Sequence, residues 1–363
     1  MARTVFIGEW DVLLLMNGFR NKDVPTVLVT GGAGYVGSHT CKALAHSGYF
    51  PVTLDTLARG HSSAVRWGPL INGDVADRAV LDKAIVMHKP IAILHFAGFA
   101  YVSESVSNPG LYFRNNTCAS LTLLEAMRDH EIDTLVFSST CATYGVPMHL
   151  PIQESDAQRP VSPYGASKLM VEQILNAFDA AHGLRSAILR YFNAAGSDPS
   201  GEIGWHHEPD TRLIPRALMA ARGEIPFLEV YGDDFDTPDG TCIRDYVHVS
   251  DLATAHVLAL RYLAGGGSSV ALNIGTGNGH SVRDVINTVE RITGESVPLR
   301  IAPRRSGDPP VLVAATSLAG QLLNFEPIES SLDHICLTAW RWLKHRTADT
   351  ADGVPPVPNL GGR

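Results

Sequence analysis

Short apolar runs alternate with longer segments of helical periodicity over the first half of the chain. An apolar run at 26–30 precedes a glycine cluster and a predicted helix at 38–47. Further strands are predicted at 51–55, 91–96, 134–139 and 186–192, with helices at 76–88, 109–130 and 162–182 between them. Near-continuously apolar strands that alternate with helices indicate an α/β protein with a doubly wound parallel sheet.

After about residue 196 this alternation loosens. A loop at 197–210 is followed by predicted helices at 211–222, 250–264, 281–293 and 331–345, and by a short strand at 271–274. The pattern predicts an N-terminal extension (1–25), a doubly wound domain (26–196), a smaller mixed α/β domain (197–345) with some segments returning to the first, and a disordered tail (346–363).

Composition and charge exclude several classes of protein. The 363 residues are 45% hydrophobic and 18% charged, which excludes a disordered, collagen-like or coiled-coil chain, and a net charge of −8 argues against a nucleic-acid partner. Five widely spaced cysteines and the His206-His207 pair lack disulfide or metal-site spacing, so a reducing, cytoplasmic compartment and no metal are expected. No apolar run approaches the ~18 residues of a membrane span, so no membrane partner is expected.

The segment 30–37, Thr-Gly-Gly-Ala-Gly-Tyr-Val-Gly, follows the first strand and opens the first helix. Glycines at 31, 34 and 37 let backbone amides approach a pyrophosphate at the helix N-terminus, as in Rossmann-type folds. Asp55 ends the next strand, where an acid accepts hydrogen bonds from a ribose and repels a 2′-phosphate; this favours NAD over NADP, although Arg59 is a counter-signal. Asp74 closes another strand and suits either an adenine contact or a helix N-cap.

Tyr164 and Lys168 are four residues apart in a predicted helix and therefore share one face. The lysine cation, together with a positively charged nicotinamide ring, is expected to lower the tyrosine pKa from near 10 toward neutrality, so that Tyr164 can act as a base. Ser138 and Thr140 end a strand at the carboxyl edge of the sheet, where hydroxyls can meet a substrate. A Tyr-x-x-x-Lys pair alone is commonly a surface pair, but beside the glycine turn it indicates a catalytic site.

This combination resembles the extended short-chain dehydrogenase/reductase family. The resemblance covers about residues 26–345 and is carried by segments 30–40, 95–98, 162–173 and 190–193. It implies an NAD-dependent enzyme that reversibly inverts C4 of a UDP-sugar, UDP-glucose or UDP-galactose, through a transient 4-keto intermediate. The first domain would then bind NAD and the second the UDP-sugar, in a homodimer formed through helices near 109–130 and 162–182.

The resemblance also assigns site residues at matching positions. Tyr164 would be the base, Lys168 its cationic partner and Thr140 the hydroxyl that guides the sugar. The residues implied for the cofactor are Gly31, Gly34, Tyr35, Val36, Gly37, Asp55, Asp74, Val75, Phe96, Ala97, Gly98, Asn115, Ser138, Lys168, Tyr191 and Phe192. Those implied for the UDP-sugar are Thr140, Tyr164, Asn193, Leu213, Tyr231, Arg244, Arg305, Asp308 and Leu312. Arginine forks match diphosphate oxygens, which agrees with the last group.

Three positions depart from the family pattern. Ala100 stands where a lysine near the cofactor is expected, Arg212 replaces an asparagine, and Leu312 stands where strict glucose/galactose enzymes carry a tyrosine. We therefore expect weaker cofactor retention and a wider sugar pocket. The open alternatives are a 4-epimerase of UDP-xylose/UDP-arabinose or of UDP-N-acetylhexosamines, a nucleotide-sugar dehydratase or decarboxylase, for which no carboxylate follows Thr140, and a non-catalytic NAD-binding sensor.

Overall fold

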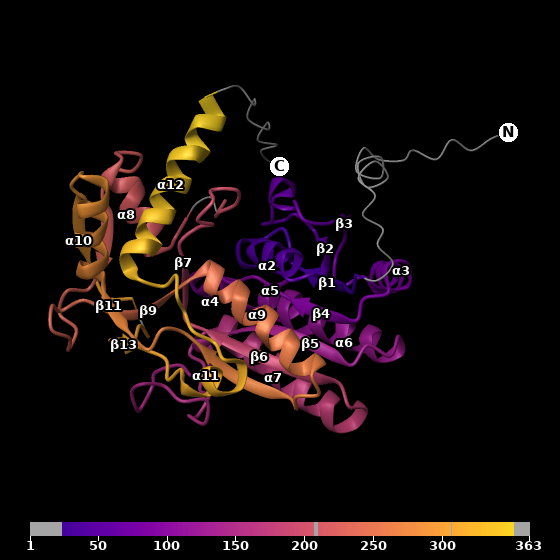
Figure 1. The fold of residues 1–363 in the computed structure, drawn as a ribbon. Helices are drawn as coiled ribbons and strands as arrows, with labels where there is room; N and C mark the ends of the chain where they lie inside the picture. Colours follow the sequence, from indigo (N-terminus) through magenta and orange to yellow (C-terminus); the bar gives the residue numbers. More distant parts are fainter. Residues whose placement is uncertain (1–23, 207–209, 306, 352–363) are drawn as a thin grey trace, which may run out of the picture. The chain divides into compact units, whose positions relative to one another are not determined.

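The computed structural model describes residues 24–206, 210–305 and 307–351, which form two compact units (Figure 1). Unit 1 contains the described residues up to 143 together with 160–190 and 253–272, and unit 2 contains 144–159, 191–252 and the described residues from 273 onward. The expected domain boundary near residue 196 stays a prediction. Of the expected terminal segments, residues 1–23 and 352–363 lie outside the described residues.

A seven-stranded sheet forms the centre of unit 1. Its strands are β1 (Thr26–Thr30), β2 (Phe50–Asp55), β3 (Leu70–Asn72), β4 (Ala92–His95), β5 (Thr134–Thr140), β6 (Arg185–Tyr191) and β10 (Val270–Ile274). They lie in the order β3-β2-β1-β4-β5-β6-β10, and the pairs β2–β3, β1–β2, β1–β4 and β4–β5 are parallel. The first six strands have the order of dinucleotide-binding folds, so the predicted Rossmann-type doubly wound sheet is confirmed.

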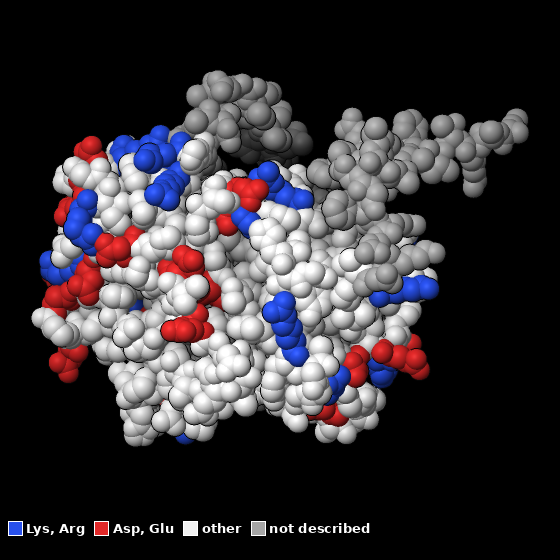
Figure 2. Space-filling model, viewed as in Figure 1, with Lys and Arg blue, Asp and Glu red and all other residues white. Residues whose placement is uncertain are grey.

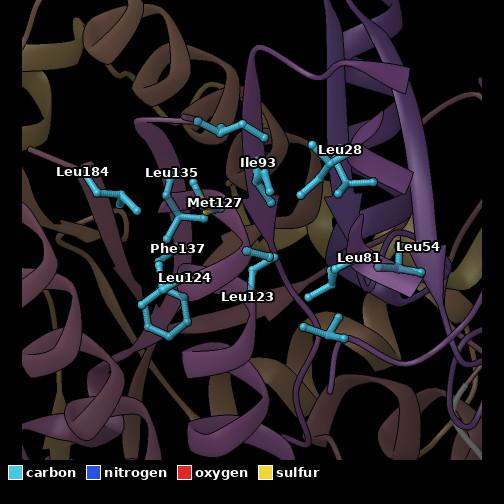
Figure 3. Close-up of a cluster of buried hydrophobic side chains, with 14 of the residues drawn as sticks. Leu28, Leu54, Leu81, Ile93, Leu123, Leu124, Met127, Leu135, Phe137 and Leu184 are labelled. Carbon is cyan, nitrogen blue, oxygen red and sulfur yellow. The ribbon is translucent and has the colours of Figure 1, made fainter. Parts of the chain in front are cut away.

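Helices cover both faces of this sheet (Figure 1). The longer ones are α2 (Tyr35–His46), α3 (Arg78–His88), α6 (Ala119–Asp129), α7 (Pro163–His182) and α9 (Val249–Ala264). On one face, α3, α6 and α7 pack on the sheet through the main apolar core, where Leu123 and Leu124 lie among side chains of β4 and β5 (Figure 3). Cys41 of α2 instead contacts Thr53, whose side chain points away from that core, so α2 covers the other face.

The sequence-based elements of unit 1 need two corrections. The helix predicted over 109–130 is confirmed as one unbroken helical run, but its middle is π-helical: it consists of α5 (Pro109–Tyr112), η2 (Phe113–Cys118) and α6, and α4 (Val102–Ser107) precedes it. The strand predicted at 271–274 in the second domain is β10, which extends the large sheet beside β6. Two 3₁₀ turns, η1 (Ser62–Ala64) and η3 (Cys141–Thr143), follow β2 and β5.

Unit 2 is built around β9 (Ile243–His248). β9 pairs with β7 (Asn193–Ala195), β11 (Gly279–Ser281) and β13 (Val311–Leu312), while β8 (Leu228–Tyr231) pairs separately with β12 (Leu299–Ala302). Its helices are α8 (Leu213–Ala221), α10 (Val282–Thr293), α11 (Ser317–Leu323) and α12 (Leu332–Ala351), so α12 runs into the segment expected as a tail. A capping box between Ser281 and Asp284 fixes the start of α10.

Charged side chains of both signs are mixed on the described surface drawn in Figure 2, with broad uncharged areas between them. All five cysteines are free thiols; Cys118 is exposed and the other four are buried. Within the described residues, no helix has both the length and the apolar character that crossing a membrane requires.

Candidate active site

The glycine turn of unit 1 joins β1 to α2 and leaves the first amides of α2 uncovered by side chains. Gly31 has φ +73°, and a Cβ there would lie 2.5 Å from the backbone nitrogen of Ala97. A Cβ on Gly37 would collide with the carbonyl of Gly31, so both positions require glycine. The N-cap of α2 is Gly34, which offers no capping side chain, and Tyr35 and Val36 begin the helix. This turn fits the pyrophosphate of a dinucleotide.

Asp55 ends β2 with its carboxylate against the glycine turn. The carboxylate accepts hydrogen bonds from the backbone N–H of Ala33 (3.0 Å) and of Leu57 (2.8 Å). Burial raises the pKa of Asp55, and these two hydrogen bonds oppose the rise. Each carboxylate oxygen has a second acceptor site, so the group suits a ribose hydroxyl as the sequence predicts.

Asp74 follows β3 and does not cap α3. Its side chain accepts a hydrogen bond from Ala76 N–H at 2.8 Å, whereas Asp77 caps α3 through the amides of its first turn. The N-cap alternative for Asp74 is therefore wrong, and its contact with adenine stays a prediction. The neighbouring Val75 is buried in the apolar core.

The segment after β4 is tied closely to η2 and α7. Phe99 N–H donates to the side-chain oxygens of Asn115 (3.2 Å) and Asn116 (2.8 Å). A Cβ on Gly98 would lie 3.2 Å from both Asn116 Oδ1 and Lys168 Nζ. Asn116 is buried and also donates to Ser167 of α7, a role that the sequence pattern did not reveal because the resemblance pointed to its neighbour Asn115. Two residues before Gly98, the ring centroid of Phe96 lies 4.6 Å from the ring centroid of His256.

The three predicted catalytic residues come together where α7 passes the end of β5. The hydroxyls of Thr140 and Tyr164 form a hydrogen bond, and Lys168 Nζ donates to the carbonyl of Ser138 at 2.9 Å. Gly165 allows this close packing, because a Cβ there would lie 2.5 Å from the carbonyl oxygen of Ala142. The structure thus brings a phenol, a lysine and a strand-end hydroxyl into one cluster.

Burial governs the electrostatics of this cluster. It lowers the pKa of Lys168 from 10.5 to about 8, partly opposed by the negative charge of Glu172. It raises the pKa of Tyr164 from 10.0 to about 12, although the hydrogen bond with Thr140 acts to lower it. In the protein without a nucleotide, burial outweighs that hydrogen bond, and the lowering expected from Lys168 together with a nicotinamide cation stays a prediction.

A buried ion pair lies one turn beyond Lys168. Glu172 accepts hydrogen bonds from Arg190, with Nη2 2.6 Å from Oε2, and from the hydroxyl of Ser139 at 2.5 Å. Both charged side chains are less than a tenth exposed. Glu172 and Arg190 lie in the segments that carry the family resemblance, but spacing alone gave them no role.

Strand β9 brings three of the predicted substrate residues of unit 2 onto neighbouring strands. Leu312 is the register partner of Arg244, and Asn193 is the partner of Tyr246. Direct partners in parallel strands share a face, as do residues two apart, so Asn193, Arg244 and Leu312 face the same way. Arg244 Nη1 donates to the carbonyl of Ile243 (2.9 Å), and its Nη2 lies 3.7 Å from Asp308 Oδ1.

The remaining predicted substrate residues of unit 2 lie on other elements. The guanidinium of Arg305 stacks 3.8 Å above the ring centroid of Tyr231, which ends β8. Leu213 is the first residue of α8 and is partly exposed. The preceding residue, Arg212, is paired with Asp210 through Nη2 at 2.5 Å, which accounts for this departure from the family pattern as a local ion pair.

Tyr191 is the last residue of β6 and Phe192 follows it; both belong to unit 2. Phe192 is buried, and its N–H donates to the carbonyl of Ile274 at 3.2 Å. Their contact with the cofactor stays a prediction. Among the residues that the structure describes, no group of three or more His, Cys, Asp or Glu side chains could hold a metal ion.

Known proteins resemble this chain over most of its length. The UDP-glucose 4-epimerase of Azospirillum brasilense is 51% identical over 335 residues, which are 92% of this chain and 96% of that protein. The crystal structure of UDP-glucose 4-epimerase from Brucella ovis in complex with NAD is 52% identical, with a TM-score of 0.86 over 87% of this chain and 97% of that one. The enzyme from Stenotrophomonas maltophila, with bound NAD and formylated UDP-arabinopyranose, is 40% identical, with a TM-score of 0.87 over 90% and 99%.

The parallel sheet, the glycine turn and the Tyr164–Lys168 cluster define a Rossmann-fold protein of the extended short-chain dehydrogenase/reductase type. The model of the NAD dependent epimerase/dehydratase family matches residues 27–275. The chain belongs to this family.

Proposed function

We infer that the protein is an NAD-dependent UDP-sugar 4-epimerase, with UDP-glucose and UDP-galactose as its substrate pair. The observation that carries this proposal is the cluster of Thr140, Tyr164 and Lys168 in the same unit as a glycine turn that fits a dinucleotide. The names of the relatives support it, since all three are UDP-glucose 4-epimerases and two were crystallised with NAD. When bound, NAD would supply a reversible hydride acceptor for C4 of the sugar, so that inversion there would involve no net oxidation.

In this mechanism Tyr164 removes the proton of the 4-hydroxyl and later returns it. The hydroxyl of Thr140 is hydrogen-bonded to the phenol and orients it for this proton transfer. A phenol whose pKa is raised to about 12 by burial is a weak base, so positive charge close to the ring must offset that burial. Lys168, buried one helical turn away and held by the Ser138 carbonyl, supplies part of this charge.

We propose that unit 2 holds the UDP part of the substrate. The guanidinium groups of Arg244 and Arg305 match diphosphate oxygens, and the stacking of Arg305 on Tyr231 limits the freedom of that side chain. Asn193, Leu213 and Asp308 complete the proposed set. Strong binding of the diphosphate with few charged groups at the sugar allows the sugar to turn and present its other face.

A second substrate class is favoured by one observation. Leu312, next to Arg244 in register, carries a shorter side chain than the tyrosine of strict glucose/galactose enzymes. We propose that the wider space also admits UDP-N-acetylhexosamines. Turnover of UDP-galactose, UDP-N-acetylgalactosamine and UDP-arabinose, compared at equal concentration, ranks these candidates.

The function is tested by incubating the purified protein with UDP-galactose and measuring UDP-glucose with UDP-glucose dehydrogenase. We expect conversion by the wild type and loss of at least about a hundredfold in kcat for Tyr164→Phe. Tyr49→Phe is the matched control, because Tyr49 immediately precedes β2, at the amino edge of the sheet. Absence of UDP-glucose with the wild type, or equal rates for wild type and Tyr164→Phe, contradicts the proposal.

We further propose a cytoplasmic homodimer. Free thiols at all five cysteines support a reducing compartment. Leu121 of α6 and Met170 of α7, on the two helices expected at the interface, are 37% and 42% exposed and supply apolar surface for a second copy. Analytical ultracentrifugation is expected to give a dimer for the wild type and a monomer for a Leu121→Glu, Met170→Glu double variant; a monomeric wild type contradicts the proposal.

A further inference from the structure

The side chain of Arg59 links two loops of unit 1. Arg59 follows β2, four residues after Asp55, and its Nη2 lies 2.6 Å from each carboxylate oxygen of Glu104. Its guanidinium carbon also lies 4.2 Å from the ring centroid of Phe99 and 4.7 Å from that of Tyr101. Thus Glu104, Phe99 and Tyr101, all from the segment after β4, bind the side chain of Arg59 from the loop after β2.

Both loops rest on the glycine turn. In the loop after β2, His61 N–H donates to the carbonyl of Ala33 at 3.0 Å, and a Cβ on Gly60 would lie 2.9 Å from Ala33 Cβ. In the segment after β4, the backbone nitrogen of Ala97 would lie 2.5 Å from a Cβ on Gly31. β1 lies between β2 and β4 in the sheet (Figure 1). The link through Arg59 therefore joins the two loops across the carboxyl end of β1.

The acceptor side of this link is held in place by its neighbours. Tyr112 donates its hydroxyl proton to Glu104 Oε2 at 2.6 Å and accepts a hydrogen bond from Tyr101 N–H at 3.0 Å. The side chain of Asn116 accepts a hydrogen bond from the N–H of Phe99 (2.8 Å) and donates one to the carbonyl of Phe99 (3.0 Å). The hydrogen bond from the guanidinium also lowers the pKa of Glu104, so the carboxylate stays charged under ordinary conditions.

We propose that Arg59 and Glu104 form a clasp that slows the release of NAD. The inference rests on the proposed function in that it takes the glycine turn as the seat of the NAD pyrophosphate. A dinucleotide seated there lies between the two loops, so a link between them opposes its departure. Ala100, between Phe99 and Tyr101, removes a lysine that the family pattern places near the cofactor. The link between Arg59 and Glu104 offsets the loss of this lysine contact. An epimerase must retain NAD because the same cofactor molecule has to stay bound through both half-reactions.

The experiment measures cofactor exchange in the purified holoenzyme. The protein with bound NAD is mixed with a large excess of isotopically labelled NAD, and the unlabelled NAD that remains bound is followed by mass spectrometry after rapid gel filtration. We expect Arg59→Ala and Glu104→Gln to release NAD about tenfold faster than the wild type, the size expected for one carboxylate pair and two cation–π contacts. Arg128→Ala is the matched control, because it breaks an exposed arginine–carboxylate pair at the end of α6.

Arg59→Lys separates a clasp from a simple charge effect. Lysine keeps the positive charge but lacks the planar fork and stacks less well, so we expect it to release NAD nearly as fast as Arg59→Ala. The clasp is overturned if Arg59→Ala or Arg59→Lys releases NAD at the wild-type rate. It is also overturned if Arg128→Ala speeds NAD release as much as the Arg59 variants do. The readout does not depend on sugar turnover: release that responds to Arg59 without conversion of UDP-galactose contradicts the proposed function alone, and conversion with an unchanged release rate contradicts the clasp alone.

Discussion

Lys168 is a buried cation whose removal is expected to stabilise the protein freed of nucleotide while abolishing its activity. Burial lowers its pKa from 10.5 to about 8, so holding the charged form costs about 3 kcal/mol at about 1.4 kcal/mol per pKa unit. Lys168→Met keeps an unbranched side chain and removes the charge, but it leaves the Ser138 carbonyl without this donor, at a cost of about 1 kcal/mol. The variant should therefore be about 2 kcal/mol more stable at pH 7.

The stability advantage of Lys168→Met over the wild type must shrink as the pH rises. The folded pKa of Lys168 lies below the unfolded value, so between about 8 and 10.5 the unfolded chain binds more protons and the wild type gains stability as the pH rises. Below the folded pKa the cost is nearly complete. At pH 9.5 it falls to about 1 kcal/mol, which matches the lost hydrogen bond, so the two proteins should then be about equally stable.

Urea unfolding followed by circular dichroism, at pH 7 and at pH 9.5, measures this difference. Lys83→Met is the matched control, because Lys83 is exposed on α3 and its replacement should change stability by less than about 0.5 kcal/mol. A Lys168→Met protein that is no more stable than the wild type at pH 7 refutes the reasoning. So does an advantage that is unchanged at pH 9.5.

Three further substitutions test other parts of the structure. Glu172→Gln should lower the free energy of unfolding by about 3–5 kcal/mol, because it leaves Arg190 buried without its carboxylate; thermal unfolding measures this, and an unchanged Tm contradicts it. Gly31→Ala should cost about 1–3 kcal/mol and abolish retention of NAD through gel filtration, because its φ of +73° and the nearby Ala97 backbone exclude a Cβ; a variant that elutes with NAD disproves this. Leu312→Tyr should shift the kcat/KM ratio by about tenfold toward UDP-galactose over UDP-N-acetylgalactosamine; equal ratios in variant and wild type exclude Leu312 as the limit on substrate size.

The parallel sheet could be predicted because β1, β2, β4, β5 and β6 are buried on both faces and therefore read as apolar runs. β10 was found as a strand, but its place beside β6 was not, since sequence periodicity cannot tell which neighbour a strand will pair with. The π-helical turn η2 was missed because its polar residues continue an ordinary helical pattern on either side.

The candidate site was predictable where the chemistry lies in a short motif. Tyr164 and Lys168 are one turn apart, so their common face follows from helix geometry alone. Arg59 and Glu104 are 45 residues apart, and only the fold brings them together. The same holds for Leu312 and Arg244, which meet through the register of two short strands. The burial that raises the pKa of Tyr164 could not be read from spacing, and the lowering expected from Lys168 and a nicotinamide cation together stays a prediction.

The position of β10 has a consequence for the order in which the protein is made. β6 is followed by about eighty residues, most of them in unit 2, before the ribosome delivers β10 as its neighbour in the sheet. During that interval the backbone of β6 has an unpaired edge, and an apolar strand with a free edge is prone to pair with other chains. The nascent nucleotide-binding unit therefore completes its sheet only late in translation, and fragments that end near residue 196 should aggregate when expressed alone.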